Sequence, residues 1–244
     1  MLKHTDCDIA INVDEDCFIT NKQAVLDLVN YVIDQKIANA GCPDGGGATP
    51  RNGNPMVTNP FFNIFNLRLI REQEGNALTI KQKVKTFNYA LHLDDMSTSY
   101  PTDILQREPL YKRVGLEPYY PFFFWLAYHF KTLYLPSKKH IDGWTTMLYD
   151  TQGHLLCQHS WLSRFYSIPS LIVRHWQPNA GQQKARIDAL IAETTTMSDI
   201  SVPKECFSDT LRYALDKIIR WCIKVPQRIM GWPKKLKKKL FRNS

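Results

Sequence analysis

Three acidic residues directly follow an apolar segment near the start of the sequence. In "DIAINVDEDCFIT" (residues 8–20), the apolar residues at 9–13 predict a buried strand, and Asp14, Glu15 and Asp16 come where that strand ends. Ligands of α/β sheets bind beyond the carboxyl ends of the strands. Carboxylates two residues apart in such a turn can bind one hard divalent cation and leave positions for water and phosphate oxygens. The segment therefore indicates a Mg²⁺ or Mn²⁺ site for a diphosphate, although the same spacing also occurs in surface turns that bind nothing.

The neighbouring segments predict an α/β fold that holds these acids between a strand and a helix. Residues 21–35 carry apolar side chains at helical spacing, and Asn21 is a suitable N-cap. Residues 41–55 are rich in Gly, Pro and Asn, which predicts a long loop. Further elements are expected at residues 61–70 (an apolar element), 81–91 and 117–130 (helices), 131–135 (a strand), and 143–150 with 154–161 (two strands joined by a turn).

The amino-acid composition excludes several classes of protein. The 244 residues, 44% of them hydrophobic and 12% aromatic, are enough for one domain with a sizeable core. The six cysteines show no C-x-x-C pair and no metal-knuckle spacing, which argues against a zinc module or a disulfide scaffold and predicts reduced, cytosolic cysteines. No apolar signal segment follows Met1, and no apolar run is long enough for a membrane span. We therefore expect a chain that is neither secreted nor integral to a membrane.

The net charge of +8 comes from the C-terminal end of the chain. Ten of the 31 basic residues and none of the 23 acidic residues lie from Lys217 onward, so the rest of the chain is slightly acidic. Apolar residues at helical spacing, flanked by Trp221 and Trp232 and followed by "KKLKKKLFR", predict a basic amphipathic helix on an anionic membrane surface. A terminal helix packed on the core with a solvated charged end is the alternative. Nucleic acid binding is disfavoured, because tryptophans beside an apolar stripe suit lipid.

The segment "INVDEDCFIT" resembles the signature of GT-A glycosyltransferases, in which a hydrophobic strand is followed by D-x-D and an apolar residue. The resemblance covers roughly residues 5–175, where "NPFFNIFN", "EPYYPFFFWL", "HIDGWTTMLYD" and "CQHSWLSRFY" look like the acceptor-side half of such enzymes in bacterial surface-polysaccharide synthesis. It implies an α/β fold with a partial GT-A-like (Rossmann-like) sheet flanked by helices, followed by the C-terminal amphipathic helix.

The resemblance also implies roles for the acids. Asp14 and Asp16 match the two acids of D-x-D, which in the family hold Mn²⁺ or Mg²⁺ and the sugar diphosphate, and Glu15 is the variable middle position. A late histidine often completes the metal shell in these enzymes. His159 is the first candidate for that ligand and His140 the second, and a hydrogen-bonded structural histidine is the alternative for either.

Inverting members of the family use a carboxylate to remove the proton of the acceptor hydroxyl, which requires an acid within reach of that hydroxyl. Glu117, just before the aromatic run, is the best match, and Asp95 and Asp94 are rivals. Glu117 has an alternative role as the cap of the following helix.

Two further segments can contribute to a nucleotide-sugar site. The loop that contains Asp44, Gly45 and Gly46 can bring backbone N–H groups close to a sugar or a phosphate, or it can be an ordinary flexible turn. Trp144 and Trp161 are candidates for stacking on a sugar ring. The six aromatic residues between 119 and 125 can supply such a platform too, but most of them must belong to the core.

The chain departs from the family in one respect. In GT-A proteins the D-x-D strand follows roughly a hundred residues that bind the nucleotide base, whereas here Asp14 comes almost at the start. We therefore expect residues 1–176 to form the acceptor-side part, 177–206 a polar linker or helix, and 207–244 the membrane-associating tail. A partner chain that supplies the donor half is a further expectation, because a sheet without its first strands exposes a hydrophobic edge.

The sequence thus predicts a metal-dependent, hexosyltransferase-like enzyme on the inner face of the cytoplasmic membrane. It would transfer a sugar from a nucleotide-diphosphate donor to a saccharide or lipid-linked acceptor in cell-surface polysaccharide synthesis. The alternatives are a non-catalytic membrane-surface adaptor, an inactive glycosyltransferase fragment, and a metal-dependent phosphotransfer enzyme that uses the same acids.

Overall fold

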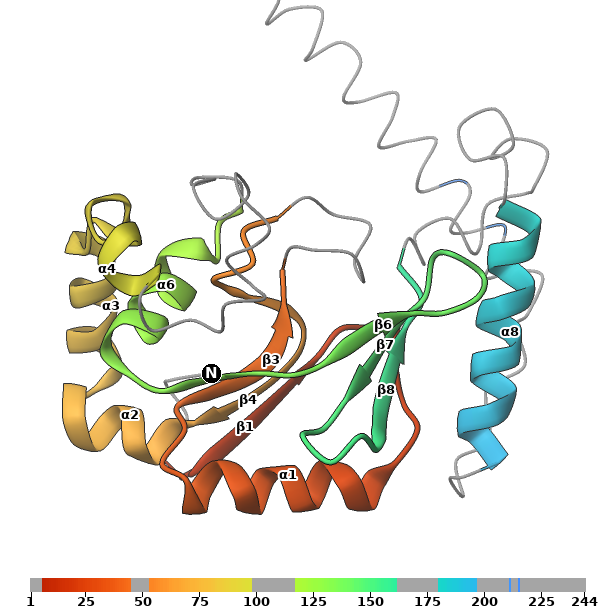
Figure 1. Ribbon diagram of the computed structural model, residues 1–244, viewed down its shortest axis with the longest axis horizontal. Helices are drawn as coiled ribbons and strands as arrows, with labels where there is room; N and C mark the ends of the chain where they lie inside the picture. Colours follow the sequence, from red (N-terminus) through yellow and green to blue (C-terminus); the bar gives the residue numbers. More distant parts are fainter. Residues whose placement is uncertain are drawn as a thin grey trace, which may run out of the picture. The chain divides into compact units, whose positions relative to one another are not determined.

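The computed structural model describes residues 6–44, 53–97, 117–161 and 180–196, together with Leu211 and Leu215, and these form a mixed α/β structure with two sheets (Figure 1). The chain divides into two units: residues 1–163 with 182–198, and residues 164–181 with 199–244. The fold described below belongs to the first unit. The membrane tail predicted at 207–244 lies outside the described residues, apart from the two leucines. Gly45 and Gly46 also lie outside them.

The first sheet carries the strand that leads into the acidic turn. Its strands pair in the order β1-β4-β3-β5, with β3 and β5 parallel and the other pairs antiparallel. The strand predicted from the apolar residues at 9–13 is confirmed as β1, but the prediction that it is buried is wrong, because β1 lies at the edge of the sheet and none of its five residues is buried. The strands are β1 (Ile9–Val13), β3 (Asn39–Pro43), β4 (Thr58–Asn66) and β5 (Thr132–Tyr134).

The loop prediction for residues 41–55 is wrong at its start, because Gly41 to Pro43 belong to β3. The side chain of any other residue at position 41 would lie 2.9 Å from the carbonyl oxygen of Phe62 on the neighbouring strand, so the sheet needs glycine there. Pro43 is tolerated because it stands at the end of the strand, beyond a shift in the pairing with β4. Gly41, a residue type that usually weakens a strand, here permits the close approach of two strands.

Helix α1 (Lys22–Asp34) forms where the sequence predicts it. The side chain of Asn21 accepts a hydrogen bond of 2.9 Å from the backbone N–H of Ala24, which confirms the predicted N-cap. One face of the helix is buried, and this face is made by Ala24, Val25, Leu28 and Val32. Because these residues recur at helical spacing, α1 covers the sheets with an apolar stripe and leaves its polar side in solvent.

The second sheet is antiparallel throughout, in the order β2-β8-β7-β6. The predicted pair of strands is confirmed as β7 and β8, joined by a turn at residues 150–154. The carboxylate of Asp150 accepts hydrogen bonds of 2.8 Å from the N–H groups of Gln152 and His154, which closes this turn. The strands are β2 (Cys17–Ile19), β6 (Ser137–Lys139), β7 (Thr146–Tyr149) and β8 (Leu155–His159).

Asp150 gives the stability of this hairpin a pH dependence. Burial raises its pKa, but hydrogen bonds from His154 and from the N–H groups of the turn lower it more, so the pKa lies below the ordinary 3.8. Because the pKa of Asp150 is lower in the folded protein than in the unfolded chain, its ionised carboxylate stabilises the fold at pH values above the unfolded pKa. This stabilisation is lost as the pH falls through the folded pKa. We expect Asp150→Ala to lower the free energy of unfolding by about 1–2 kcal/mol at neutral pH, with a smaller difference as the pH falls below 3.8.

Urea denaturation of the wild type and the Asp150 variant across this pH range measures the effect. Asp34→Ala, at the exposed end of α1, is the matched control and should leave the free energy of unfolding nearly unchanged. A difference between wild type and the Asp150 variant that stays constant from neutral to acid pH would contradict the assignment.

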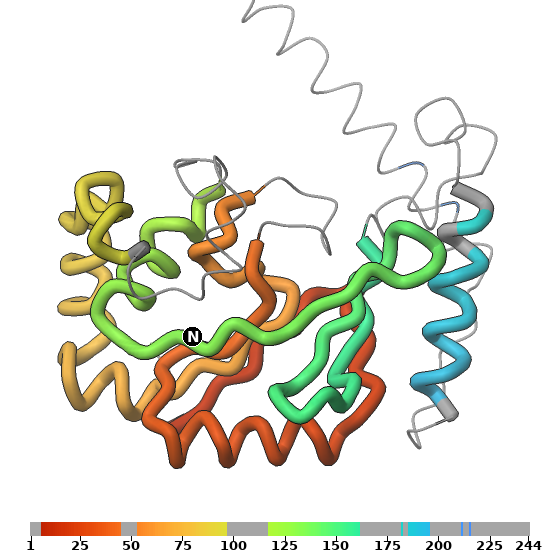
Figure 2. The backbone as a smooth tube through the Cα atoms, in the orientation of Figure 1, coloured from red at the N-terminus to blue at the C-terminus, as the bar shows by residue number. Residues whose placement is uncertain are grey.

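The helices of residues 67–129 gather at one end of the first sheet, away from β7 and β8 (Figure 1). They enclose a core in which Tyr120, Phe124 and Trp125 are fully buried, so the aromatic run belongs to the core, as expected. The chain then crosses from this end to the second sheet through residues 130–139 (Figure 2). The helices are α2 (Leu67–Glu74), α3 (Ala77–Thr86), the 3₁₀ turn η1 (Tyr89–Leu91), α4 (Leu93–Ser97) and α6 (Tyr120–His129).

Helix α8 (Ala180–Thr196) occupies the segment expected as a polar linker or helix. Ile187 and Leu190 are buried, and residues 182–198 belong to the first unit. The segment therefore packs on that unit through an apolar stripe. Its spacing of three residues between Ile187 and Leu190 is typical of an amphipathic helix.

Strand β1 forms one edge of the first sheet. Among the described residues it pairs with β4 alone, and Ile11 and Val13 are 43% and 40% exposed. An edge strand with exposed apolar side chains is a surface on which another strand can add. This observation agrees with the hydrophobic edge that the sequence predicts.

Candidate metal centre

The acidic residues occupy the turn between the two sheets. Strand β1 of the first sheet ends at Val13, and β2 of the second sheet begins at Cys17. The N–H of Asp14 donates to the carbonyl of Phe61 at 2.9 Å, and the N–H of Cys17 donates to the carbonyl of Asp14 at 3.0 Å. These bonds anchor both ends of the turn, so Asp14 and Asp16 are held at the junction of the sheets.

Pairing of β2 with β8 brings a residue from the far end of the unit to this turn. Cys17 lies opposite His159 in the antiparallel register. The N–H of Ser160 donates to the carbonyl of Asp16 at 3.0 Å and extends the pairing by one residue. His159 and Asp16 are 143 positions apart in the sequence but become neighbours through this pairing.

Asp14, Asp16 and His159 form a group that could hold a metal ion. One ligand atom from each residue lies within 4.8 Å of the others, and Nε2 of His159 is 2.9 Å from Oδ1 of Asp16. The side chains of Asp16 and His159 are 13% and 4% exposed, whereas Asp14 is the exposed member of the group. The group is therefore anchored on its inner side and open to solvent on the Asp14 side.

Two aromatic rings fix the imidazole of His159. Phe61 stacks on it with ring centres 4.5 Å apart, and Trp161 contacts it edge to face at 4.2 Å. The indole N–H of Trp161 donates to Thr146 at 2.8 Å, so Trp161 is itself held in place. Trp161 adopts a φ of +53°, which a bulky residue rarely does, and this turns the chain two residues after His159. Nδ1 of His159 is buried without a hydrogen-bond partner among the described residues.

The donor set suits a divalent cation. Carboxylate oxygens are ligands for Mg²⁺ and Mn²⁺, and an imidazole nitrogen favours Mn²⁺ over the harder Mg²⁺. Three protein ligands leave coordination positions for water or for two phosphate oxygens. The group that the structure brings together contains the three residues named from the sequence as metal ligands.

Glu15 and His140 lie outside the group. Glu15 is exposed. His140 follows β6, and its Nδ1 lies 3.1 Å from Oδ2 of Asp142, so its described contact is with another carboxylate.

Asp44, named as a donor-site residue, lies in a buried network. Its side chain is fully buried and accepts hydrogen bonds from the hydroxyls of Tyr120 at 2.7 Å and Tyr119 at 3.1 Å, and from the amide of Asn59. Burial and the charge of Asp44 raise the pKa of Tyr120. The Tyr120 hydroxyl also accepts from the N–H of Asn54 at 2.7 Å. These hydrogen bonds connect Asp44, before segment 45–52, and Asn54, after it, to Tyr120 of α6.

Two of the carboxylates named as catalytic candidates, Asp94 and Asp95, stand apart from the acidic turn in the fold. Asp95 is 74% exposed on α4, 3.7 Å from the ring of His92, and α4 lies at the opposite end of the first sheet from β8 (Figure 1). Asp94 is also exposed on α4. Glu117 precedes α6, and its carbonyl accepts the N–H of Tyr120 at 3.2 Å.

Sequence reasoning missed Phe61, which contacts the group, and Arg186, which packs near it. Phe61 lies within an apolar strand and has no local signal for its contact with His159. Arg186 lies in the segment expected as a linker, but its side chain reaches the second sheet, where it donates to Gln158 and lies 3.6 Å from Asp142. The apolar spacing of Ile187 and Leu190 was the available signal that this segment packs.

Comparison of the chain with protein-family models, with curated proteins and with solved structures found no match. Among the described residues, no helix is both long and apolar enough to cross a bilayer. A proposal for the function therefore depends on the geometry of the site.

Proposed function

We propose that this chain is the acceptor-side part of a GT-A-like glycosyltransferase. It would transfer a sugar from a nucleotide-diphosphate donor to a saccharide or lipid-linked acceptor of a cell-surface polysaccharide. The observation that carries the proposal is the convergence of Asp14, Asp16 and His159, whose ligand atoms lie within 4.8 Å of one another. The D-x-D spacing after a strand and the α/β architecture support it further.

Each residue of the group has a distinct task in this proposal. Asp14 and Asp16 hold the cation, which when bound neutralises charge on the leaving diphosphate. His159 supplies a nitrogen ligand, and Phe61 and Trp161 keep its ring in one plane. Glu117 remains the proposed base for the acceptor hydroxyl, because Asp95 stands on an exposed helix at the far end of the sheet.

Turnover of a panel of UDP-sugars and GDP-sugars with Mn²⁺ and simple saccharide acceptors tests the function. The proposal predicts release of the nucleoside diphosphate by the wild type and its loss in Asp16→Ala. Release of inorganic phosphate in place of the diphosphate would favour a phosphotransfer enzyme. No turnover in a preparation that contains every partner of the chain would favour the adaptor or the inactive fragment.

We also propose that a partner chain supplies the nucleoside-binding half by pairing along β1. The exposed Ile11 and Val13 on this edge support the proposal. A photo-crosslinking residue at position 11 should capture that chain in the source cells. The same residue at position 26 is the control, because Leu26 on α1 is equally exposed at 43%. Equal capture at both positions would count against pairing along β1.

The tail would place the protein on the inner face of the cytoplasmic membrane. Leu211 and Leu215, four residues apart on a helix, are each about half exposed, which suits an apolar stripe. Deletion of residues 207–244 should abolish sedimentation with anionic liposomes. Unchanged sedimentation would contradict the membrane role.

A further inference from the structure

Phe61 contacts both halves of the candidate metal group. It lies in β4 of the first sheet and is fully buried. Its carbonyl accepts the N–H of Asp14 at 2.9 Å, and its ring stacks on the imidazole of His159 with an interplanar angle of 5°. Asp14 follows a strand of the first sheet, whereas His159 belongs to the second sheet. A single residue therefore connects candidate ligands that come from two different sheets.

Phe61 is itself held by its neighbours. The side-chain oxygen of Asn59 accepts the N–H of Phe61 at 3.1 Å, and the side-chain amide of Asn59 donates to the buried carboxylate of Asp44. The ring of Phe61 also meets Trp161 edge to face, with ring centres 5.9 Å apart. Because the rings of Phe61, His159 and Trp161 contact one another in pairs, none of them can turn without displacing another.

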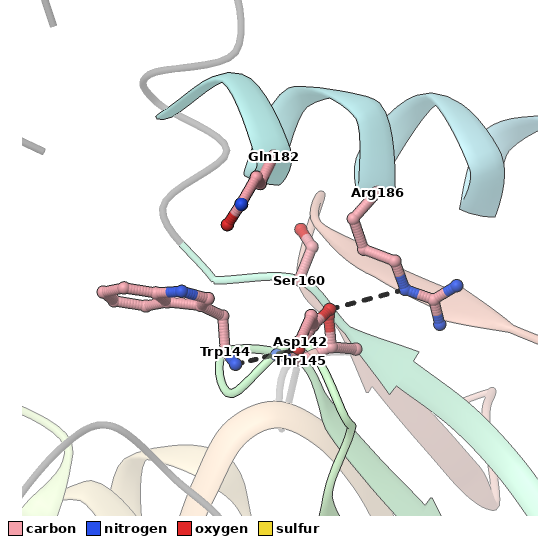
Figure 3. A pocket seen from close by; sticks show the side chains of 6 residues that line it. All are labelled: Asp142, Trp144, Thr145, Ser160, Gln182 and Arg186. Atoms are coloured by element: carbon pink, nitrogen blue, oxygen red, sulfur yellow. Dashed lines mark hydrogen bonds and ion pairs between the residues drawn. The ribbon is translucent and has the colours of Figure 1, made fainter. Parts of the chain in front are cut away.

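The backbone on either side of His159 is fixed independently of the imidazole ring. Ser160, the next residue, donates its N–H and its hydroxyl to the carbonyl of Asp16, at 3.0 and 3.4 Å. Gln158, the preceding residue, accepts a hydrogen bond from Arg186. Figure 3 shows Ser160 near helix α8, from which Arg186 extends toward the second sheet. The backbone of His159 therefore has its own anchors, and the aromatic contacts act on the orientation of its ring.

The orientation of the imidazole decides whether its nitrogen can reach a cation. An imidazole that changes rotamer moves Nε2 away from the ligand position. In the plane set by Phe61, Nε2 of His159 lies 2.9 Å from Oδ1 of Asp16, inside the group. Residues that orient a ligating histidine typically contribute roughly 10–100-fold to metal affinity. An imidazole nitrogen favours Mn²⁺ over Mg²⁺, so a residue that fixes the ring also affects which ion is preferred.

We propose that Phe61 is a positioning residue that sets the metal preference of the site. It holds the imidazole of His159 in the ligand position, so that the nitrogen ligand is available and the site prefers Mn²⁺ to Mg²⁺. This inference rests on the proposed function, because it requires that Asp14, Asp16 and His159 hold the cation. It goes beyond that function by assigning the choice of ion to a buried residue that is not itself a ligand.

Titration of the full chain with Mn²⁺, and with Mg²⁺ in competition, tests this inference in Phe61→Leu. Leucine keeps the position apolar but removes the ring, so Mn²⁺ binding should weaken roughly tenfold and Mg²⁺ binding less. Phe62→Leu is the matched control, because Phe62 is equally buried in the same strand and its side chain points to the opposite face of the sheet. It should leave the ratio of the two affinities unchanged. Urea denaturation checks that each variant is folded, and Phe61→Met, which also removes the ring, replaces Phe61→Leu if the leucine variant is unfolded.

A double-mutant cycle separates positioning of the imidazole from a general structural role. In a His159→Ala background, Phe61→Leu has no imidazole to release, so it should not weaken Mn²⁺ binding further. In a wild type that binds Mn²⁺, additive losses, equal losses for the two ions, or the same change of ratio in Phe62→Leu would overturn this inference alone. A wild type that binds neither ion would overturn the proposed metal site, and this inference with it.

Discussion

Replacement of Asp16 by alanine is expected to weaken Mn²⁺ binding by at least about 100-fold, or about 2.7 kcal/mol. The substitution removes a proposed carboxylate ligand and also the group that lies 2.9 Å from Nε2 of His159. Titration of Mn²⁺ followed by electron paramagnetic resonance measures the affinity directly. Glu15→Ala is the matched control, because it removes an adjacent, exposed acid that lies outside the group.

The Glu15→Ala control distinguishes a metal site of defined geometry from nonspecific attraction of the ion by negative charge. If Glu15→Ala weakens Mn²⁺ binding as much as Asp16→Ala, exposed acids attract the ion without a defined geometry. His159→Ala should weaken Mn²⁺ about tenfold and Mg²⁺ less, because an imidazole suits Mn²⁺ better. Equal losses for the two ions would mean that His159 is not a ligand.

Replacement of Asp44 by alanine is expected to lower the free energy of unfolding by about 3–5 kcal/mol. The change leaves the hydroxyls of Tyr119 and Tyr120 and the amide of Asn59 without their common acceptor in a buried site. Each unsatisfied donor costs about 1–3 kcal/mol, and part of this is recovered by relaxation. Equilibrium denaturation in urea measures the change.

Tyr119→Phe provides the matched control for this network. It removes one hydroxyl but leaves Asp44 its bonds from Tyr120 and Asn59, so it should cost only about 1 kcal/mol. A loss below about 1 kcal/mol for Asp44→Ala would show that the carboxylate is not a structural anchor. That result would favour the ligand-binding role that the sequence suggests for Asp44 over a structural one.

Local patterns predicted the elements that frame the site. Strand β1, helix α1 with its cap at Asn21, and the β7–β8 hairpin each have a signal within about fifteen residues. The acids of the turn could be placed for the same reason, because they follow β1 directly. His159 was named through the resemblance to a family, and its position beside Asp16 depends on the pairing of β2 with β8.

The predictions that failed or were missed depend on contacts between distant segments. The sequence predicts that Gly41 lies in a loop. It lies instead in an inner strand of a sheet, where only glycine fits against the carbonyl oxygen of Phe62. The sequence around Asp44 is that of a loop or flexible turn. Its carboxylate instead accepts hydrogen bonds from Tyr119 and Tyr120, which lie 75 and 76 positions further along the sequence. Arg186 lies in a polar segment, and its contact with Asp142 has no signal in the neighbouring sequence. In each case the deciding neighbour comes from another element.

Calorimetric titration with UDP and GDP, with and without Mn²⁺, tests the central claim most directly. It compares the wild type with a variant in which Asp14 and Asp16 are both alanine. We expect nucleotide binding that requires Mn²⁺ in the wild type and is absent from the folded double variant. Nucleotide binding of equal strength in both proteins, or binding that does not depend on the metal, would contradict a metal site built from Asp14, Asp16 and His159.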